Sequence, residues 1–275
     1  MIQDIYPKKY DNTYKNIEPS SGDYVLIYDG GEAVFKNDRR EFFTYDDTER
    51  LFGYLPSLSY IYLFSIDDAR FFLLSGADVS GFKDRIRHIQ FREFEPQWLG
   101  FAGICGANLA KWYGSVKYCG RCGERTEHSN TERAMVCPEC GSIYYPVICP
   151  AVIVAVINGD KILMTKYAYG TYRKYALVAG YTEIGETLER TVEREVLEEV
   201  GLKVKNIRYY ASQPWPFSGT ELMGFIAEVD GNDEVTLDTS ELAEAKWFGR
   251  DEIMEEENPK SLTNTLIQAF RRGEI

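Results

Sequence analysis

Residues 180–202 read GYTEIGETLERTVEREVLEEVGL, and this stretch decides the fold of the region around it. Four aliphatic residues recur at every fourth position and predict a packed amphipathic helix: Leu188, Val192, Val196 and Val200. Glu195, Glu198 and Glu199 crowd another edge of that helix, where they repel one another and raise one another's pKa unless a cation lies among them. Because Mg²⁺ bridges carboxylates to substrate phosphates, the pattern predicts a divalent metal site.

A second interpretation of these glutamates is a solvated acidic helix face. The spacing of the segment favours the metal site over this interpretation. A solvated face does not need a glycine at each end and an arginine inside at fixed offsets. The order Gly-x5-Glu-x7-Arg-Glu-Val-x-Glu-Glu-x-Gly-Leu resembles the Nudix box. Every specified position is met, namely Gly180, Glu186, Arg194, Glu195, Val196, Glu198, Glu199, Gly201 and Leu202.

The resemblance implies a loop–helix–loop that holds divalent metal and hydrolyses a nucleoside diphosphate linked to another group. It implies that Glu195 and Glu199 are metal ligands and that Glu198 or Glu199 is the catalytic base. It implies that Glu186 and Arg194 form an internal ion pair that shapes the loop. Gly180 and Gly201 are also expected to have structural roles.

The whole-chain composition sets limits on the partners. The 275 residues are 44% hydrophobic and 27% charged, an ordinary globular composition for two domains or one large domain with a small module. The net charge of −12 argues against broad electrostatic binding to nucleic acid or anionic membranes, so a phosphate-bearing substrate needs metal at its site. The start shows no signal-peptide region, and the longest apolar run, 147–157, is too short to span a bilayer. We therefore expect a cytoplasmic protein with no membrane partner.

The first 95 residues carry no motif that we attach to chemistry. Aromatic and β-branched runs at 24–28, 60–66 and 71–74 alternate with turns such as Asp29-Gly30-Gly31, which predicts antiparallel hairpins. A helix is expected from the spacing of Leu99, Ala102, Leu109 and Trp112. We expect residues 1–115 to form a mainly β domain with a structural or dimer-forming role.

Two Cys-x2-Cys pairs, 14 residues apart, follow this domain: Cys119, Cys122, Cys137 and Cys140. Four thiolates at this spacing predict one tetrahedral Zn²⁺ site in a ribbon over residues 116–146. Two disulfides or a redox pair are the alternatives, which a cytoplasmic chain and the ribbon spacing disfavour. With all four positions filled, the zinc is expected to be structural. Ribbons often bind nucleic acid, but mixed local charges favour a scaffold here.

Residues 147–275 alternate predicted strands and helices around the box. A hairpin turn at Asn158-Gly159-Asp160 joins strands 152–157 and 161–167, and a strand over 176–179 leads into Gly180. Strands 203–212, 221–229 and 245–248 and a closing helix over 260–272 follow. The predicted fold class is α/β: a Nudix α/β/α sandwich with a mixed sheet, preceded by a zinc ribbon and a mainly β N-terminal domain.

A second signature, SQPWPFSGT, occupies residues 212–220. Prolines on both sides of a tryptophan predict a rigid, extended loop that displays aromatic rings. These rings either close a core or form a wall that stacks a purine or nicotinamide ring. The order of N-terminal domain, ribbon, Tyr-Tyr-Pro, box and this loop resembles the NADH pyrophosphatase (NAD-capped RNA hydrolase) branch of the Nudix family. Ser218 stands where that branch has a proline.

This closer resemblance implies further site residues. Tyr145 and Tyr181 are expected to stack on the nicotinamide ring. Glu241 is expected as a third metal carboxylate, and Ala179 as a ligand through its carbonyl. The substrate-binding residues implied are Arg87, Glu132, Tyr145, Tyr181, Gln213, Pro214, Trp215, Pro216, Phe217, Ser218, Gly219 and Thr220.

The implied function is hydrolysis of the pyrophosphate of NADH or NAD to nicotinamide mononucleotide and AMP, with removal of NAD caps from RNA as a further activity. Two or three Mg²⁺ or Mn²⁺ ions on Glu195, Glu199 and Glu241 would activate a water, and a box carboxylate would take its proton. The alternatives are hydrolysis of another nucleoside diphosphate, such as ADP-ribose or a dinucleoside polyphosphate, and a non-catalytic nucleotide sensor. The resemblance also implies a homodimer.

Overall fold

The computed structural model describes residues 1–29, 32–36, 40–53, 58–81, 86–87, 94–170, 173–216 and 218–275. These residues form two compact units. The first unit comprises Ile2–Val147 with Pro216–Ser218, and the second comprises Met1, Ile148–Trp215 and Gly219–Ile275. The N-terminal region and the ribbon therefore share one unit, and their separation near residue 115 stays a prediction.

The second unit is built on a six-stranded mixed sheet. Its strand order is β15-β16-β12-β13-β17, with β14 also paired to β12. Strands β12 and β16 are parallel, and the other neighbours are antiparallel. The strands are Cys149–Asn158 (β12), Lys161–Tyr167 (β13), Val178–Tyr181 (β14), Val204–Trp215 (β15), Thr220–Val229 (β16) and Leu242–Gly249 (β17).

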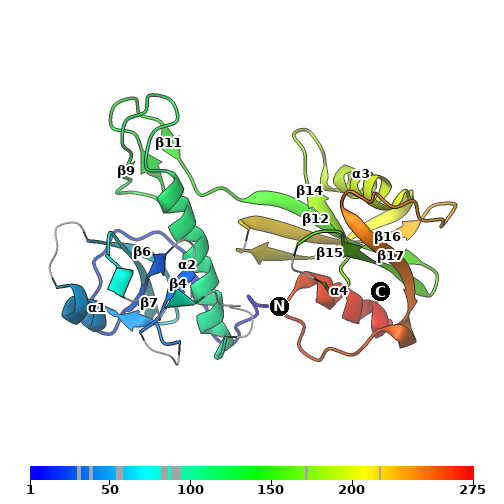
Figure 1. The fold of residues 1–275 in the computed structure, drawn as a ribbon, viewed down its shortest axis with the longest axis horizontal. Helices are drawn as coiled ribbons and strands as arrows, with labels where there is room; N and C mark the ends of the chain where they lie inside the picture. The colour runs from blue at the N-terminus through cyan, green and yellow to red at the C-terminus, as the bar shows by residue number, and fades with distance from the viewer. Residues whose placement is uncertain are drawn as a thin grey trace. The chain divides into compact units, whose positions relative to one another are not determined.

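Helices α3 (Leu188–Val200) and α4 (Leu262–Arg271) cover opposite faces of this sheet (Figure 1). Side chains alternate between the two faces of a strand, so β12 contributes to both cores. One core joins Val152, Val154 and Val156 to the valines of α3, and the other joins Ile153, Ala155 and Ile157 to Leu262, Leu266 and Phe270 of α4. The predicted α/β/α sandwich with a mixed sheet is confirmed. A short 3-10 helix, η3 (Arg250–Glu252), follows β17.

In its described residues, the first unit contains short strands, two α-helices and the ribbon. A five-stranded sheet has the order β1-β6-β7-β2-β5, and two three-stranded sheets have the orders β3-β4-β8 and β11-β10-β9. The elements before the ribbon are β1 (Tyr10–Asp11), β2 (Tyr24–Leu26), β3 (Tyr28–Asp29), β4 (Glu32–Val34), β5 (Phe43–Thr44), α1 (Tyr45–Phe52), β6 (Ser59–Ile66), β7 (Ala69–Ser75), β8 (Ile86–Arg87) and α2 (Gln97–Ser115). The ribbon strands are β9 (Glu127–His128), β10 (Met135–Val136) and β11 (Ile143–Tyr144).

Two predicted boundaries in the second unit were wrong. The strand before the box lies at Val178–Tyr181, so Gly180 is inside β14 and pairs with Val152. The stretch from Ser212 to Trp215 belongs to β15 rather than to an extended loop. Proline is tolerated in this strand because β15 is at the edge of the sheet, where a missing N–H donor breaks no ladder.

Helix α2 lies close to Leu26 of β2 and Tyr28 of β3 at Gly106. A Cβ added to Gly106 would overlap the Leu26 side chain and would lie 2.6 Å from the Tyr28 hydroxyl oxygen. That hydroxyl donates a hydrogen bond to the Gly103 carbonyl at 2.6 Å, which holds the ring against the helix. The packing of α2 therefore depends on the missing side chain at position 106.

We predict that Gly106→Ala lowers the free energy of unfolding by roughly 1–3 kcal/mol, since overpacking must displace Leu26 or Tyr28. Gly114→Ala in the same helix is the control, because no atom lies within 4 Å of its added Cβ. That control should be neutral or stabilising by about 0.5–1 kcal/mol. Urea unfolding of the two variants measures the difference, and equal effects would contradict the close approach.

Candidate active site

Helix α3 carries the box glutamates, and local contacts fix both of its ends. The Thr187 hydroxyl accepts a hydrogen bond from the Arg190 amide at 3.3 Å and caps the first turn. Gly201 ends the helix with φ +72°, and its amide donates to the Leu197 carbonyl. A Cβ on Gly201 would also lie 2.8 Å from the Thr236 Cβ. The last glycine of the box is thus required by its backbone conformation and by packing.

The segment between β16 and β17 completes the end of α3 and brings further carboxylates to it. The Thr236 amide donates to the Val200 carbonyl at 3.0 Å, and the Asp238 amide donates to the Glu199 carbonyl at 2.9 Å. These bonds satisfy carbonyls that the last turn of a helix leaves unpaired. The charges of Asp238 and Glu241 thereby come close enough to raise the pKa of Glu199.

The guanidinium of Arg194 joins the loop before α3 to the helix. It binds both carboxylate oxygens of Glu186, at 2.7 and 2.9 Å, and the Tyr181 carbonyl at 2.9 Å. Its Nη1 atom also donates to Glu195 at 2.7 Å and to Glu198 at 3.0 Å. The forked pairing with Arg194 lowers the pKa of Glu186 to about 2. The two residues expected to form the internal ion pair of the box lie in this contact.

Gly180 makes room for the carboxylate of Glu195. A Cβ built on Gly180 would overlap the carboxyl carbon and both oxygens of Glu195. Gly180 is held in place by its strand pairing with Val152, so it cannot move aside without breaking the sheet. A side chain at position 180 would therefore displace Glu195 from the site.

Glu199 is the most perturbed carboxyl group of the site. It is 4% exposed, and burial first, then the charges of Glu195 and Glu241, raise its pKa to about 8. A backbone hydrogen bond from Ala179 acts in the opposite direction. Burial also raises the pKa of Glu195, against the lowering effect of Arg194. Ionising this cluster at neutral pH is unfavourable without a cation.

The acidic side chains near the end of α3 are of the type that binds a divalent cation. The charge of Glu241 raises the pKa of both Glu195 and Glu199, and the Ala179 backbone N–H donates to Glu199. An all-oxygen set is what Mg²⁺ and Mn²⁺ prefer. Glu198, by contrast, has a side chain that is 58% exposed, so it remains accessible to solvent and to a substrate.

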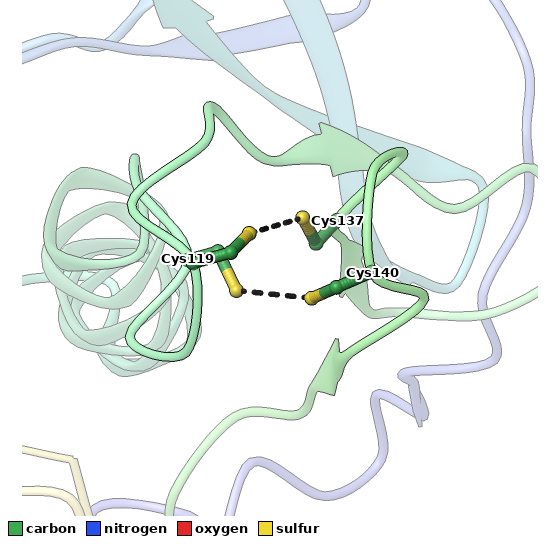
Figure 2. A group of neighbouring side chains, drawn as sticks. Cys119, Cys137 and Cys140 are labelled. Atoms are coloured by element: carbon green, nitrogen blue, oxygen red, sulfur yellow. Dashed lines mark hydrogen bonds between the residues drawn. The ribbon is translucent and has the colours of Figure 1, made fainter.

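The ribbon holds the second candidate metal site. The four cysteine Sγ atoms all lie within 4.8 Å of one another, the one such group of potential ligands in the described part of the chain. The Cys119–Cys140 and Cys122–Cys137 Sγ pairs are each 3.5 Å apart. Figure 2 labels three of these residues, Cys119, Cys137 and Cys140. Thiolates about 2.3 Å from a tetrahedral ion lie close to this spacing, so the group fits one Zn²⁺. Each pair is followed by a glycine with positive φ, +80° at Gly123 and +70° at Gly141.

The two expected stacking tyrosines lie in different units. In the first unit the Tyr145 hydroxyl donates to Glu132 at 3.1 Å, which brings these two expected substrate contacts together. In the second unit the Tyr181 hydroxyl lies 3.2 Å from the Thr220 hydroxyl. Both rings are 53% exposed and thus available to a ligand.

The other expected substrate residues are divided between strand, turn and undescribed positions. Gln213 is fully buried, and its amide accepts from the Leu262 amide at 2.7 Å and donates to the Lys260 carbonyl at 3.3 Å. It therefore holds the start of α4. Pro214 and Trp215 end β15, Pro216, Ser218 and Gly219 lie in the turn, and Thr220 begins β16. Phe217 and the side chain of Arg87 lie outside the described residues.

Three further residues shape these sites, and no pattern in the sequence indicated them. The buried Thr191 hydroxyl donates to Glu186 at 3.1 Å, and it occupies an unspecified position of the box. Asp238 adds charge beside Glu199 through a contact between distant segments. In the ribbon the Tyr144 hydroxyl accepts from the Gly120 amide at 2.9 Å and lies 3.1 Å from the Cys119 Sγ.

Comparisons with known proteins identify two domain types in the chain. Residues 148–269 match the NUDIX domain family, and residues 115–145 match the NADH pyrophosphatase zinc ribbon domain. The chain is 44% identical over 163 residues to the NAD-capped RNA hydrolase NudC of Escherichia coli O9:H4 (strain HS) and to that of Shigella boydii serotype 18. The match covers 59% of this chain and 63% of each relative.

Among solved structures, a NUDIX hydrolase from Nitrosomonas europaea is 28% identical, with a TM-score of 0.49 over 57% of this chain and 90% of that one. Residues 148–269 are thus similar to NUDIX domains, and residues 115–145, ahead of them, are similar to the zinc ribbon of NADH pyrophosphatases. Within the part of the chain that the structure describes, no helix has both the length and the hydrophobicity to cross a bilayer.

We predict that Glu199→Gln stabilises the metal-free protein. The folded pKa of about 8 lies above the ordinary value of 4.5, so the native state binds more protons than the unfolded state between these pH values. Stability conferred by the protonated group is therefore lost as pH rises from 4.5 to 8. At pH 8 in EDTA the free energy of unfolding of the variant should exceed that of the natural protein by roughly 1–3 kcal/mol. This difference should shrink toward pH 4.5.

Denaturant unfolding at several pH values measures this difference. The control is Glu257→Gln at an exposed position, whose free energy of unfolding should be close to that of the natural protein at every pH. A Glu199→Gln variant no more stable than the natural protein at pH 8 would contradict the burial of an unfavourable charge.

We predict one Zn²⁺ per chain on the ribbon cysteines. Cys137→Ser removes a buried thiolate ligand, so it should lower the zinc content to near zero and destabilise the first unit. Cys149→Ser, outside the ribbon, should keep full zinc. Metal analysis by mass spectrometry checks both variants, and unchanged zinc in Cys137→Ser would refute the assignment.

Proposed function

We propose that this protein is a metal-dependent pyrophosphatase of NAD(H), which yields nicotinamide mononucleotide and AMP, and that it also removes NAD caps from RNA 5′ ends. The buried Glu199, held beside Glu195 and Glu241 at the end of α3, carries the proposal. Its burial among like charges is costly and serves no packing purpose that an apolar residue would not serve better. The relatives at 44% identity, named as NAD-capped RNA hydrolases, support the choice of substrate.

The proposed chemistry needs residues in two roles. Glu195, Glu199, Glu241 and the Ala179 carbonyl would hold two or three Mg²⁺ or Mn²⁺ ions, which supply positive charge for the pyrophosphate and acidify a water. The water oxygen then bonds to one phosphorus while the bond from that phosphorus to the bridging oxygen breaks, which leaves a monophosphate on each half. Glu198 or Glu199 takes the water proton.

The surrounding residues position these groups. Arg194 holds Glu195 at 2.7 Å and ties it to Glu186, so the carboxylate cannot rotate freely. Gly180 lets that carboxylate lie against the strand. Preorganised charge of this kind is usually the main contribution to phosphoryl transfer.

We further propose that the substrate's rings stack on Tyr145, Tyr181, Trp215 and Phe217, with Arg87, Glu132, Gln213, Pro214, Pro216, Ser218, Gly219 and Thr220 as further contacts. The half-exposed rings of Tyr145 and Tyr181 support this role. Gln213 would act through the position of β15, since its own amide is buried. We also propose a homodimer in the cytoplasm, with structural zinc in the ribbon.

A product assay with a substrate panel tests the proposal. Purified protein with Mg²⁺ or Mn²⁺ is offered NADH, NAD, ADP-ribose, diadenosine polyphosphates and NAD-capped RNA, and the nucleotides are separated by chromatography. Turnover of NADH, NAD or capped RNA ahead of the others is the expected result. Preference for ADP-ribose or a dinucleoside polyphosphate would assign a different Nudix substrate, and binding without turnover would favour a nucleotide sensor.

Glu199→Gln should slow turnover by on the order of 100-fold or more, because it removes a metal-binding charge and a candidate base. Circular dichroism verifies the fold of the variant, and Glu257→Gln serves as the matched control. Turnover near the natural rate in a folded Glu199→Gln protein would exclude Glu199 from the chemistry.

A further inference from the structure

A cavity of about 450 Å³ lies on the second unit, away from the box. Its walls come from the ends of β12 and β16, from the start of β15 and from η3. The charged side chains that line it are Lys205, Arg208, Glu228 and Arg250. Three cationic side chains and one side-chain carboxylate line the cavity together with Ile275, in a chain with a net charge of −12.

The cavity is separate from the proposed active site. Val152 of β12 pairs with Gly180 of the box, whereas Ile157, five residues further along the strand, lines the cavity. At about 3.3 Å per residue these positions are roughly 16 Å apart. They also face opposite sides of the sheet, since Val152 packs with α3 and Ile157 with α4.

Arg208 is the least neutralised of the three cations. Its side chain is exposed and makes no hydrogen bond or ion pair with the described residues. Lys205 pairs with Asp230 at 3.1 Å, but both side chains are at least half exposed, so solvent screens this contact. The Glu228 carboxylate accepts from the Asn206 amide at 2.8 Å rather than from a cation.

Arg250 is fixed in place by packing. Its guanidinium carbon lies 4.2 Å from the centroid of the Phe270 ring, and Nη2 donates to the main-chain oxygen of Ile275 at 3.1 Å. Nη1 is buried and has no acceptor among the described residues. Within the same residues, no side-chain carboxylate pairs with this guanidinium. Arg250 is thus held at the cavity wall by the Phe270 ring and by the Ile275 oxygen.

We propose that this cavity is a second anion site, which binds the phosphate group of a nucleotide or of an RNA backbone. Guanidinium groups present donors that match phosphate oxygens, and a stacked arginine loses little freedom when it binds one. The volume is within the usual range for small-molecule sites, about 300–1,000 Å³. The proposal does not depend on the proposed enzymatic activity.

Binding in the absence of divalent metal tests the site, because the metal-free box repels phosphate. Inorganic phosphate, AMP and a single-stranded oligoribonucleotide with a 5′-hydroxyl are titrated into the full chain in EDTA. Amide chemical shifts report where each probe binds, and calorimetry reports the affinity. The test variant is Lys205→Gln/Arg208→Gln. The control is Lys203→Gln, which changes an exposed cation of the same segment that does not line the cavity.

We expect shifts at Lys205, Arg208 and Arg250, and dissociation constants at least about tenfold weaker in the double variant than in the control. Binding by phosphate or AMP would identify a free nucleotide as the ligand, and binding by the oligoribonucleotide alone would identify a phosphodiester backbone. No binding of any probe, or equal binding by the double variant, would overturn the proposal. Unfolding midpoints of the variants verify that both remain folded.

Discussion

The contact on which the proposed active site depends is the one between Arg194 and the glutamates around it. One guanidinium binds Glu186 through two oxygens and also holds Glu195 and Glu198. This neutralises part of a segment that would otherwise repel itself, and it fixes the loop against the helix. The same contact directs Glu195 onto the bare Cα of Gly180, so the arginine and the glycine act on one carboxylate from two sides.

The carboxylate of Glu199 lies in surroundings that disfavour its ionised form. Glu199 is buried among Glu195, Glu241 and Asp238, and nothing on the helix compensates it as Arg194 compensates Glu186. Sites of chemistry often retain such unfavourable groups because the charge is needed when a ligand arrives. The valines of α3, which are fully buried against β12, supply the packing that offsets this cost.

Local sequence patterns predicted the helix of the box correctly. The errors in the strand and loop boundaries come from contacts between residues far apart in the chain. The aliphatic repeat and the final glycine located α3 correctly, because both signals act within one helix. The strand before the box was misplaced because its register is set by β12, which local propensity does not reveal. The loop around Pro214 was misassigned because a proline is tolerated at a sheet edge. Asp238 and the cations around Arg208 and Arg250 come together from segments far apart in the chain, so no spacing in the sequence indicates them.

The central claim is that the end of α3 forms a divalent metal centre. The most direct measurement is a crystal structure of the protein grown with Mn²⁺, with anomalous diffraction collected near the manganese absorption edge. The claim predicts at least one anomalous peak within bonding distance of the Glu195 and Glu199 carboxylates, and Ala179 or Glu241 as a further ligand. Manganese bound elsewhere, with Glu195 and Glu199 making no contact to it, would contradict the claim.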